Sequence, residues 1–79
     1  MKTASILLPD VAAIKLFVSI VEQYEFDVDL ICGRYRINAK SLMGILSLGS
    51  GIPMTIEMHG TEEEAAELLG KLDIYVVKN

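Results

Sequence analysis

The sequence lacks most features that would assign it to a membrane, a nucleic acid or an oxidising compartment. It has one cysteine, Cys32, so no internal disulfide can form. The seven basic residues form no cluster and the formal net charge is −4, which argues against nucleic-acid binding. The longest apolar stretch, residues 11–21, is interrupted by Lys15 and Ser19 and falls short of the roughly 18 residues of a membrane span. With no signal-peptide pattern in residues 1–5, we expect a cytoplasmic protein without membrane insertion.

Apolar residues are abundant for so small a chain. They make up 52% of the sequence, and the mean hydropathy is +0.43. We expect residues 1–79 to form one domain, and a domain of this size buries only about 60% of the surface that its unfolded chain exposes. It has no room for a deep active site, so any function should lie on the surface. The excess apolar surface is expected to meet protein, including a second copy of the chain in a homodimer, and not lipid.

Hydrophobic periodicity and capping residues predict the element order β-α-β-β-α-β-α. Asp10 is a suitable N-cap for the first helix, and Thr61 with Glu64 forms a capping box for the last one. Residues 73–77 are β-branched and ambiguous. Two hairpin-linked halves of this kind give an α+β fold, a four-stranded antiparallel sheet with helices on one face. The predicted strands are residues 2–8, 27–32, 35–38 and 54–58, and the predicted helices are residues 11–23, 41–49 and 62–72.

Residues 38–49 (NAKSLMGILSLG) are the most specific motif in the chain. They resemble the regulatory-serine segment of the HPr family, the small phosphocarriers of the bacterial sugar phosphotransferase system (PTS). The resemblance runs without a gap from Glu22 to Gly49 and extends over residues 62–72, while the loop at residues 50–53 is about two residues shorter than the family pattern. It implies the HPr-like open-faced β-sandwich, with three helices on one face of the sheet, and no cofactor.

The resemblance breaks down where the family carries its phosphate. Counted back without gaps from Tyr24, the family's His-x-Arg-Pro motif falls on residues 10–13. Asp10 then stands at the position of the phosphate-accepting histidine, Ala12 at that of the phosphate-pairing arginine, and Ala13 at that of the proline. No histidine precedes His59, so no shift of the count supplies one. The resemblance therefore implies a divergent HPr-like protein with no catalytic residue, and not an enzyme.

Asp10 and His59 each have a chemical and a structural interpretation. A carboxylate can form an acyl phosphate or imitate a phosphorylated state, but the helix N-cap explains Asp10 more simply. His59 precedes Gly60 at a predicted turn, where a solvent-exposed histidine is a simpler interpretation than a displaced phosphate carrier. No second histidine, cysteine or acidic cluster has metal-ligand spacing with His59, so no metal site is expected. Cys32 is expected to be a small buried apolar residue.

Ser41 has two compatible roles. As a helix N-cap it contributes about 1 kcal/mol, and a phosphate at this helix end would be tolerated. The resemblance implies that Ser41 is the regulatory phosphorylation site, modified by an HPr kinase/phosphorylase, and that a catabolite regulator is a further partner. It also implies that Leu42, Met43 and Leu46 are exposed apolar docking residues, although ordinary core packing is an alternative for them.

Three functions of different classes remain open. The favoured one is a regulatory or interaction module with the HPr fold that does not transfer phosphate. The second is an active phosphocarrier that uses an atypical acceptor, and the third is a self-associating structural domain. Only the second requires a phosphoryl group to be carried, so a phosphotransfer assay separates it from the others.

Overall fold

The computed structural model describes residues 1–78, and its elements follow the predicted order. The predicted boundaries differ from the observed ones by one or two residues, as is common at frayed ends. None of the helices described in residues 1–78 has the length and apolar character that crossing a membrane would take. The elements are β1 (Lys2–Leu7), α1 (Val11–Val21), β2 (Val28–Cys32), β3 (Tyr35–Asn38), α2 (Leu42–Leu48), β4 (Pro53–Met58), α3 (Glu62–Lys71) and a 3₁₀ turn, η1 (Asp73–Tyr75).

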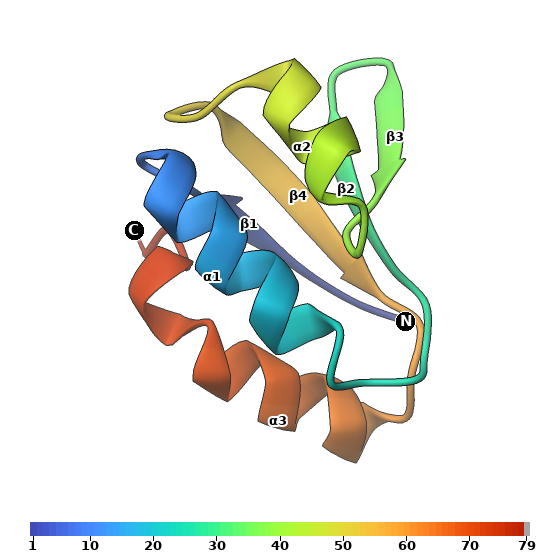
Figure 1. The fold of residues 1–79 in the computed structure, drawn as a ribbon. Coiled ribbons are helices and arrows are strands. Elements are labelled where there is room, and N and C mark those ends of the chain that lie inside the picture. The colour runs from blue at the N-terminus through green and yellow to red at the C-terminus, as the bar shows by residue number, and fades with distance from the viewer. Residues whose placement is uncertain (79) are drawn as a thin grey trace.

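The four strands form one antiparallel sheet in the order β1-β4-β2-β3. The strand β4 is therefore central, paired with β1 on one side and with β2 on the other, although it is the last strand in the chain. The three helices lie together on one face of this sheet, and the other face is open (Figure 1). The predicted fold class, an α+β open-faced β-sandwich, is confirmed.

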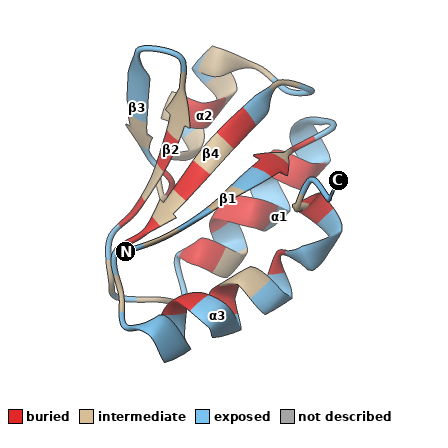
Figure 2. Ribbon diagram, turned by 180° about the vertical axis from the view of Figure 1, so that it is seen from behind, coloured by how far each residue is buried: buried red, intermediate tan, exposed pale blue. Residues whose placement is uncertain are grey.

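The core lies between the sheet and the helices. Successive side chains of a strand point to opposite faces of the sheet, so every second residue points into this core. Along β4, Met54, Ile56 and Met58 are buried, whereas Thr55 and Glu57 lie on the open face, an alternation that Figure 2 shows as bands of colour. The helix α1 contributes its inward stripe to the same core, and α3 contributes a narrower one. The buried residues of these two helices are Ala13, Ile14, Phe17, Val18, Val21, Ala65 and Leu68.

The segment after α3, which the sequence left ambiguous, follows the outer edge of β1. After η1, Val76 forms an isolated antiparallel bridge with Ile6, and the Val77 N–H donates to the Ser5 carbonyl over 2.8 Å. The edge of β1 is thereby covered in part, which limits its pairing with other chains. The other edge strand is β3.

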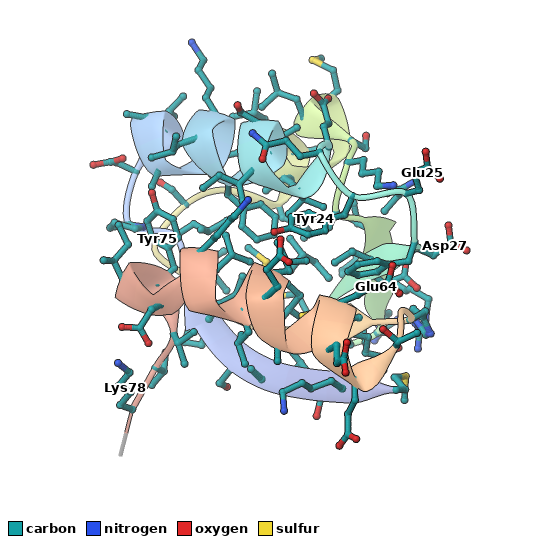
Figure 3. All side chains as sticks on the ribbon, turned by 90° about the horizontal axis from the view of Figure 1, so that it is seen from below. Tyr24, Glu25, Asp27, Glu64, Tyr75 and Lys78 are labelled. Carbon is teal, nitrogen blue, oxygen red and sulfur yellow. The ribbon has the colours of Figure 1, made fainter. Side chains whose placement is uncertain are left out.

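Tyr24 ties the end of α1 to α3. Its ring lies between the two helices (Figure 3), its Oη donates to Glu67 Oε1 over 2.9 Å, and Lys71 Nζ lies 5.2 Å from the ring centroid. The neighbouring ring of Phe26 fills the space beside Gly60, where a Cβ atom would come within 2.7 Å of it. Glycine at this position lets the Phe26 ring pack directly against the backbone that follows His59.

Candidate functional sites on the two faces of the sheet

Asp10 is the N-cap of α1, as predicted. Its backbone is extended (φ −152°, ψ 177°), and its Oδ1 accepts a hydrogen bond from the Ala13 N–H over 2.8 Å. This carboxylate satisfies one of the backbone donors that a helix start leaves free. Ala12 is exposed beside it and Ala13 is buried. The motif position that the resemblance assigned to phosphate chemistry therefore holds a helix cap and two methyl groups.

Ser41 is the N-cap of α2, again as predicted. Its Oγ accepts a hydrogen bond from the Gly44 N–H over 3.1 Å. Gly44 leaves space for this close approach, because a Cβ atom there would lie 2.9 Å from Ile37 Cγ2 and 3.0 Å from Ser41 Oγ. Ser41 itself is half-buried, so its hydroxyl is partly accessible from solvent.

The three expected docking residues do not share one environment. Met43 is 77% exposed, whereas Leu42 and Leu46 are half-buried and pack against the core. The expectation that all three are exposed is therefore wrong for two of them. Residues four apart lie on the same side of a helix, so Leu42 and Leu46 both lean toward the core around the fully buried Ile45.

Asp10 and Ser41 both lie on the helical face. Ser41 begins α2, whereas Asp10, at the start of α1, lies near the other end of α2. The loop after α2 contacts the segment just before Asp10, since the Gly51 N–H donates to the Leu8 carbonyl over 2.7 Å. Asp10 is thus close to the end of α2, while Ser41 begins it. A helix of this length spans about 10 Å. The elements α1 and α2 also leave three large apolar side chains exposed, Val11, Leu16 and Met43.

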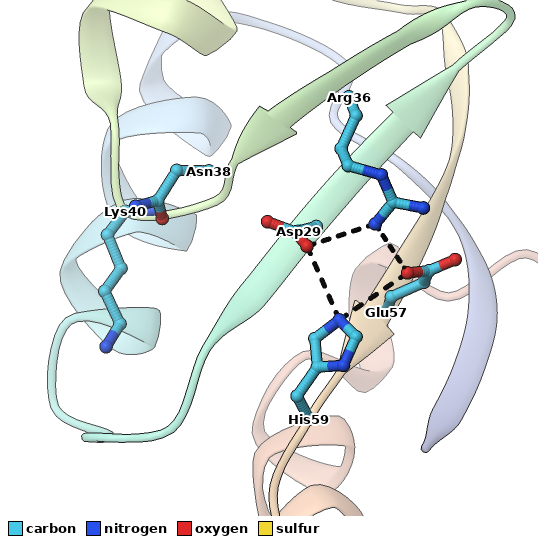
Figure 4. A network of polar contacts seen from close by, with 6 residues as sticks. All are labelled: Asp29, Arg36, Asn38, Lys40, Glu57 and His59. Atoms are coloured by element: carbon cyan, nitrogen blue, oxygen red, sulfur yellow. Dashed lines mark hydrogen bonds and ion pairs between the residues drawn. The ribbon is translucent and has the colours of Figure 1, made fainter.

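A polar cluster occupies the open face of the sheet, formed by Asp29, Arg36, Glu57 and His59 (Figure 4). The register pairs Asp29 of β2 directly with Glu57 of β4, and Arg36 reaches them from β3. Arg36 Nη1 lies 3.1 Å from Asp29 Oδ2 and 2.7 Å from Glu57 Oε1. From the opposite side, His59 Nε2 lies 3.4 Å and 3.5 Å from the same two oxygens.

The cluster shifts the pKa values of two of its members. The hydrogen bond from Arg36 lowers the pKa of Glu57, against the opposing effect of partial burial, and the charges of Arg36 and His59 lower it further. In turn, the hydrogen bonds to Glu57 and then to Asp29 raise the pKa of Arg36. Glu57 is therefore held as a carboxylate across the neutral range.

The sequence did not reveal this cluster. His59 is solvent-exposed at a turn, as expected, but the inference that it has no acidic partners is corrected by the structure. Spacing along the chain cannot show that β2 and β4 are neighbours, and it is this pairing that places Asp29 opposite Glu57. The period of two does place Glu57 and His59 on one side of an extended segment, so half of the cluster was available from the sequence.

The four-stranded sheet with three helices on one face and the serine-capped α2 place this chain in a class of small α+β proteins. Comparisons with known proteins show which family of that class it belongs to. The family model described as "PTS HPr component phosphorylation site" matches residues 11–77, beginning directly after Asp10. The chain belongs to the HPr family of phosphotransferase-system phosphocarriers. No curated protein matches it.

Solved structures give the same result. A phosphocarrier protein HPr from Bacillus anthracis str. Ames is 34% identical, with 96% of this chain and 94% of that one covered and a TM-score of 0.69. HPr-C-His from Thermoanaerobacter tengcongensis is 30% identical, with 91% and 90% covered and a TM-score of 0.74. The histidine-containing phosphocarrier protein from Mycoplasma, 15% identical with 99% and 100% covered, has a TM-score of 0.72 and shares the fold.

Proposed function

We propose that this HPr-family chain is a regulatory or interaction module of the sugar phosphotransferase system that carries no phosphoryl group on histidine. One observation carries the proposal. The single histidine of the sequence, His59, lies on the open face of the sheet, and the start of α1 is capped by Asp10. In this proposal the chain has no catalytic group of its own and works in the cytoplasm, in keeping with its free cysteine, Cys32.

The surroundings of Asp10 do not favour phosphoryl transfer. Its carboxylate already accepts the Ala13 N–H, so it is engaged in holding the helix start. A phosphoryl group on it would bring further negative charge, and Ala12 beside it offers no positive charge to offset this. Asp10 therefore acts in this proposal as a structural cap that occupies the acceptor position.

The surroundings of His59 are unfavourable for a different reason. Its Nε2 faces the carboxylates of Asp29 and Glu57 at 3.4 Å and 3.5 Å. A phosphoryl group on that nitrogen would be negatively charged, so the two carboxylates would repel it. The same two carboxylates stabilise an imidazole or imidazolium ring at this position. His59 also lies on the far side of the sheet from α1 and α2, the elements that resemble the family's docking surface.

Incubation with enzyme I and phosphoenolpyruvate, followed by intact mass at neutral pH, tests the proposal. We expect no added phosphate on this chain under conditions that phosphorylate the Bacillus anthracis phosphocarrier. Asp10→His alone should not restore full transfer, because Ala12 still stands at the arginine position. An acid-labile phosphate on the wild type that is lost in His59→Ala would establish instead an atypical phosphocarrier.

The second part of the proposal is that Ser41 is a regulatory phosphorylation site. Its hydroxyl is half-buried at the start of α2, and Met43, the most accessible apolar residue of α2, lies two positions further on. A phosphate there adds about −2 charge while its oxygens can still accept the Gly44 N–H, so the cap and the fold should survive. The surface around Met43 would then change from apolar to apolar and anionic.

The partners in this proposal are an HPr kinase/phosphorylase that adds the phosphate and a catabolite regulator with a basic groove that recognises it. The absence of an arginine at Ala12 weakens the second contact, so modification is the firmer expectation. With kinase and ATP, we expect labelling of the wild type and of Ser47→Ala, and none of Ser41→Ala. Ser47 is a matched control, an exposed serine of α2 whose hydroxyl donates to the Gly44 carbonyl. No labelling of the wild type, or equal labelling of Ser41→Ala, would leave Ser41 as a helix cap only.

A further inference from the structure

We propose that Asp29, Glu57 and His59 form a binding site for a divalent transition-metal cation, of which zinc is the best example, and that Arg36 competes with the metal for this site. The site lies on the open face of the sheet, away from α1 and α2. It is independent of phosphotransfer and of the modification of Ser41.

The distances between the three ligand atoms suit a metal ion. With bond lengths of about 2.0–2.2 Å, two ligands of a tetrahedral zinc ion lie about 3.4 Å apart. His59 Nε2 lies 3.4 Å from Asp29 Oδ2 and 3.5 Å from Glu57 Oε1. The three ligand atoms all lie within 4.8 Å of one another. A small movement of the two carboxylates toward each other is enough to complete a three-ligand site.

The backbone holds these ligands in position. Asp29 and Glu57 are directly opposite each other across the paired strands β2 and β4. The His59 N–H donates to the Asp27 carbonyl over 2.9 Å, which fixes the chain just after β4. The side chains of Glu57 and Asp29 are only 14% and 26% exposed, so little solvation is lost when they bind a cation.

The donor set indicates which metal fits. One imidazole nitrogen and two carboxylate oxygens suit zinc and its first-row neighbours, whereas calcium and magnesium prefer oxygen ligands alone. The two carboxylates together balance the charge of a divalent ion. A hollow beside the cluster is lined by Asp27, Val28, Asp29, Asn38 and His59, and it leaves room for water to complete the coordination.

Arg36 explains how the cluster is stable without a metal. Its Nη1 contacts the same two oxygens, Asp29 Oδ2 and Glu57 Oε1, that would ligate the ion. A cation bound at these oxygens and the Arg36 guanidinium therefore exclude each other. The Arg36 side chain is 57% exposed and comes from the edge strand β3, so it can move into solvent when a metal enters.

Titration of the full chain with zinc chloride, by calorimetry and by NMR of the imidazole, tests the site. We expect one zinc ion per chain with a shift of the His59 ring signals, and a loss of affinity of more than about tenfold in His59→Gln and in Asp29→Asn. Two control variants lie outside the site. Glu67→Gln removes one carboxylate charge from α3, as Asp29→Asn does from β2, and Cys32→Ser removes the one thiol of the sequence. Both variants should bind zinc as the wild type does.

The competition gives a second, opposite expectation. Arg36→Gln should bind zinc about fivefold more tightly, because the ion no longer displaces an exposed ion pair. The wild type failing to bind zinc, or His59→Gln and Asp29→Asn binding as tightly as Glu67→Gln, would overturn the proposal. An affinity in Arg36→Gln equal to or weaker than that of the wild type would overturn the competition. None of the substituted residues belongs to the buried core, so circular dichroism of each variant should match the wild type.

Discussion

The two faces of the sheet use their polar side chains differently. On the helical face, Asp10 and Ser41 each accept one backbone N–H from a residue three positions further along the chain. On the open face, Arg36 and His59 contact the carboxylates of Asp29 and Glu57. Three of these four contacts join different segments of the sheet, seven to 30 residues apart, and only His59 and Glu57 are near neighbours in the chain. The helical-face groups stabilise their own helix starts, whereas the open-face groups depend on the register of the whole sheet.

This difference separates what each face can do. A cap residue whose hydrogen bond is local can be modified, as we propose for Ser41, without disturbing the sheet. The open-face cluster concentrates charge from β2, β3 and β4 at one place, which is what a ligand-binding site needs. The modification that we propose at Ser41 and the metal site that we propose at Asp29, Glu57 and His59 therefore lie on opposite faces of the sheet.

The sharpest test of the comparison uses neighbouring residues of β4 that point to opposite faces. Ile56 is fully buried toward the helices, and Glu57 lies on the open face. Ile56→Ala should lower the free energy of unfolding by about 2–5 kcal/mol, because it removes buried methyl groups and leaves a cavity. Glu57→Gln should have a far smaller effect. Urea unfolding of both variants measures the difference.

Ile56→Val serves as the control within the core, and it should cost only about 0.5–1.5 kcal/mol. If Glu57→Gln were as destabilising as Ile56→Ala, the open-face cluster would be a main source of stability and the two faces would not differ as described. The slope of unfolding free energy against urea should stay unchanged, since neither variant alters the surface exposed on unfolding.

The same division decides how much the sequence could predict. Alternation in residues 54–58 gave the faces of β4, and Asp10, Ser41 and Thr61 gave the starts of all three helices, because each of these signals lies within a few residues. Strand order does not lie within any short segment. The pairing of Asp29 with Glu57 and the bridge from Val76 to Ile6 both depend on it, so they emerged only from the structure.

The second prediction concerns the two caps. Asp10→Ala and Ser41→Ala should each lower the free energy of unfolding by about 1 kcal/mol, because each leaves one backbone N–H of a helix start without its partner. The residues cap different helices and share no hydrogen bond, so the double variant should show the sum of the two effects. Thermal and urea unfolding of the three variants checks this.

Asp10→Asn and Ser41→Thr keep an oxygen that can accept the capping hydrogen bond, and both should retain most of the wild-type stability. A full effect in Asp10→Asn but not in Ser41→Thr would show that Asp10 acts mainly through its charge at the start of α1. A strongly non-additive double variant would show that the two helix starts are coupled through the loop that follows α2.

The smallest expected effect is the pH dependence of the open face. The hydrogen bond from Arg36 holds the pKa of Glu57 below its ordinary value of 4.5 in the folded chain. The folded state therefore binds a proton less readily than the unfolded state, so this contribution to stability is present above the unfolded pKa and is lost as the pH falls through the folded pKa. Asp29 and His59 share the cluster, so Glu57 must be followed by its own carboxyl carbon signal in NMR.

Arg36→Gln removes the largest cause of that shift, and the remaining partial burial acts to raise the pKa. We expect the pKa of Glu57 to move up toward 4.5 in this variant. Its unfolding free energy should then fall less steeply than that of the wild type between about pH 5 and about pH 3. Lys71→Gln is the matched control, since it removes one positive charge from an ion pair with Glu67 on α3 and should leave the titration of Glu57 unchanged. An unchanged pKa of Glu57 in Arg36→Gln would mean that His59 and the sheet, and not Arg36, set the charge state of the open face. Arg36 would then compete with a metal ion for the two carboxylates less strongly than we propose.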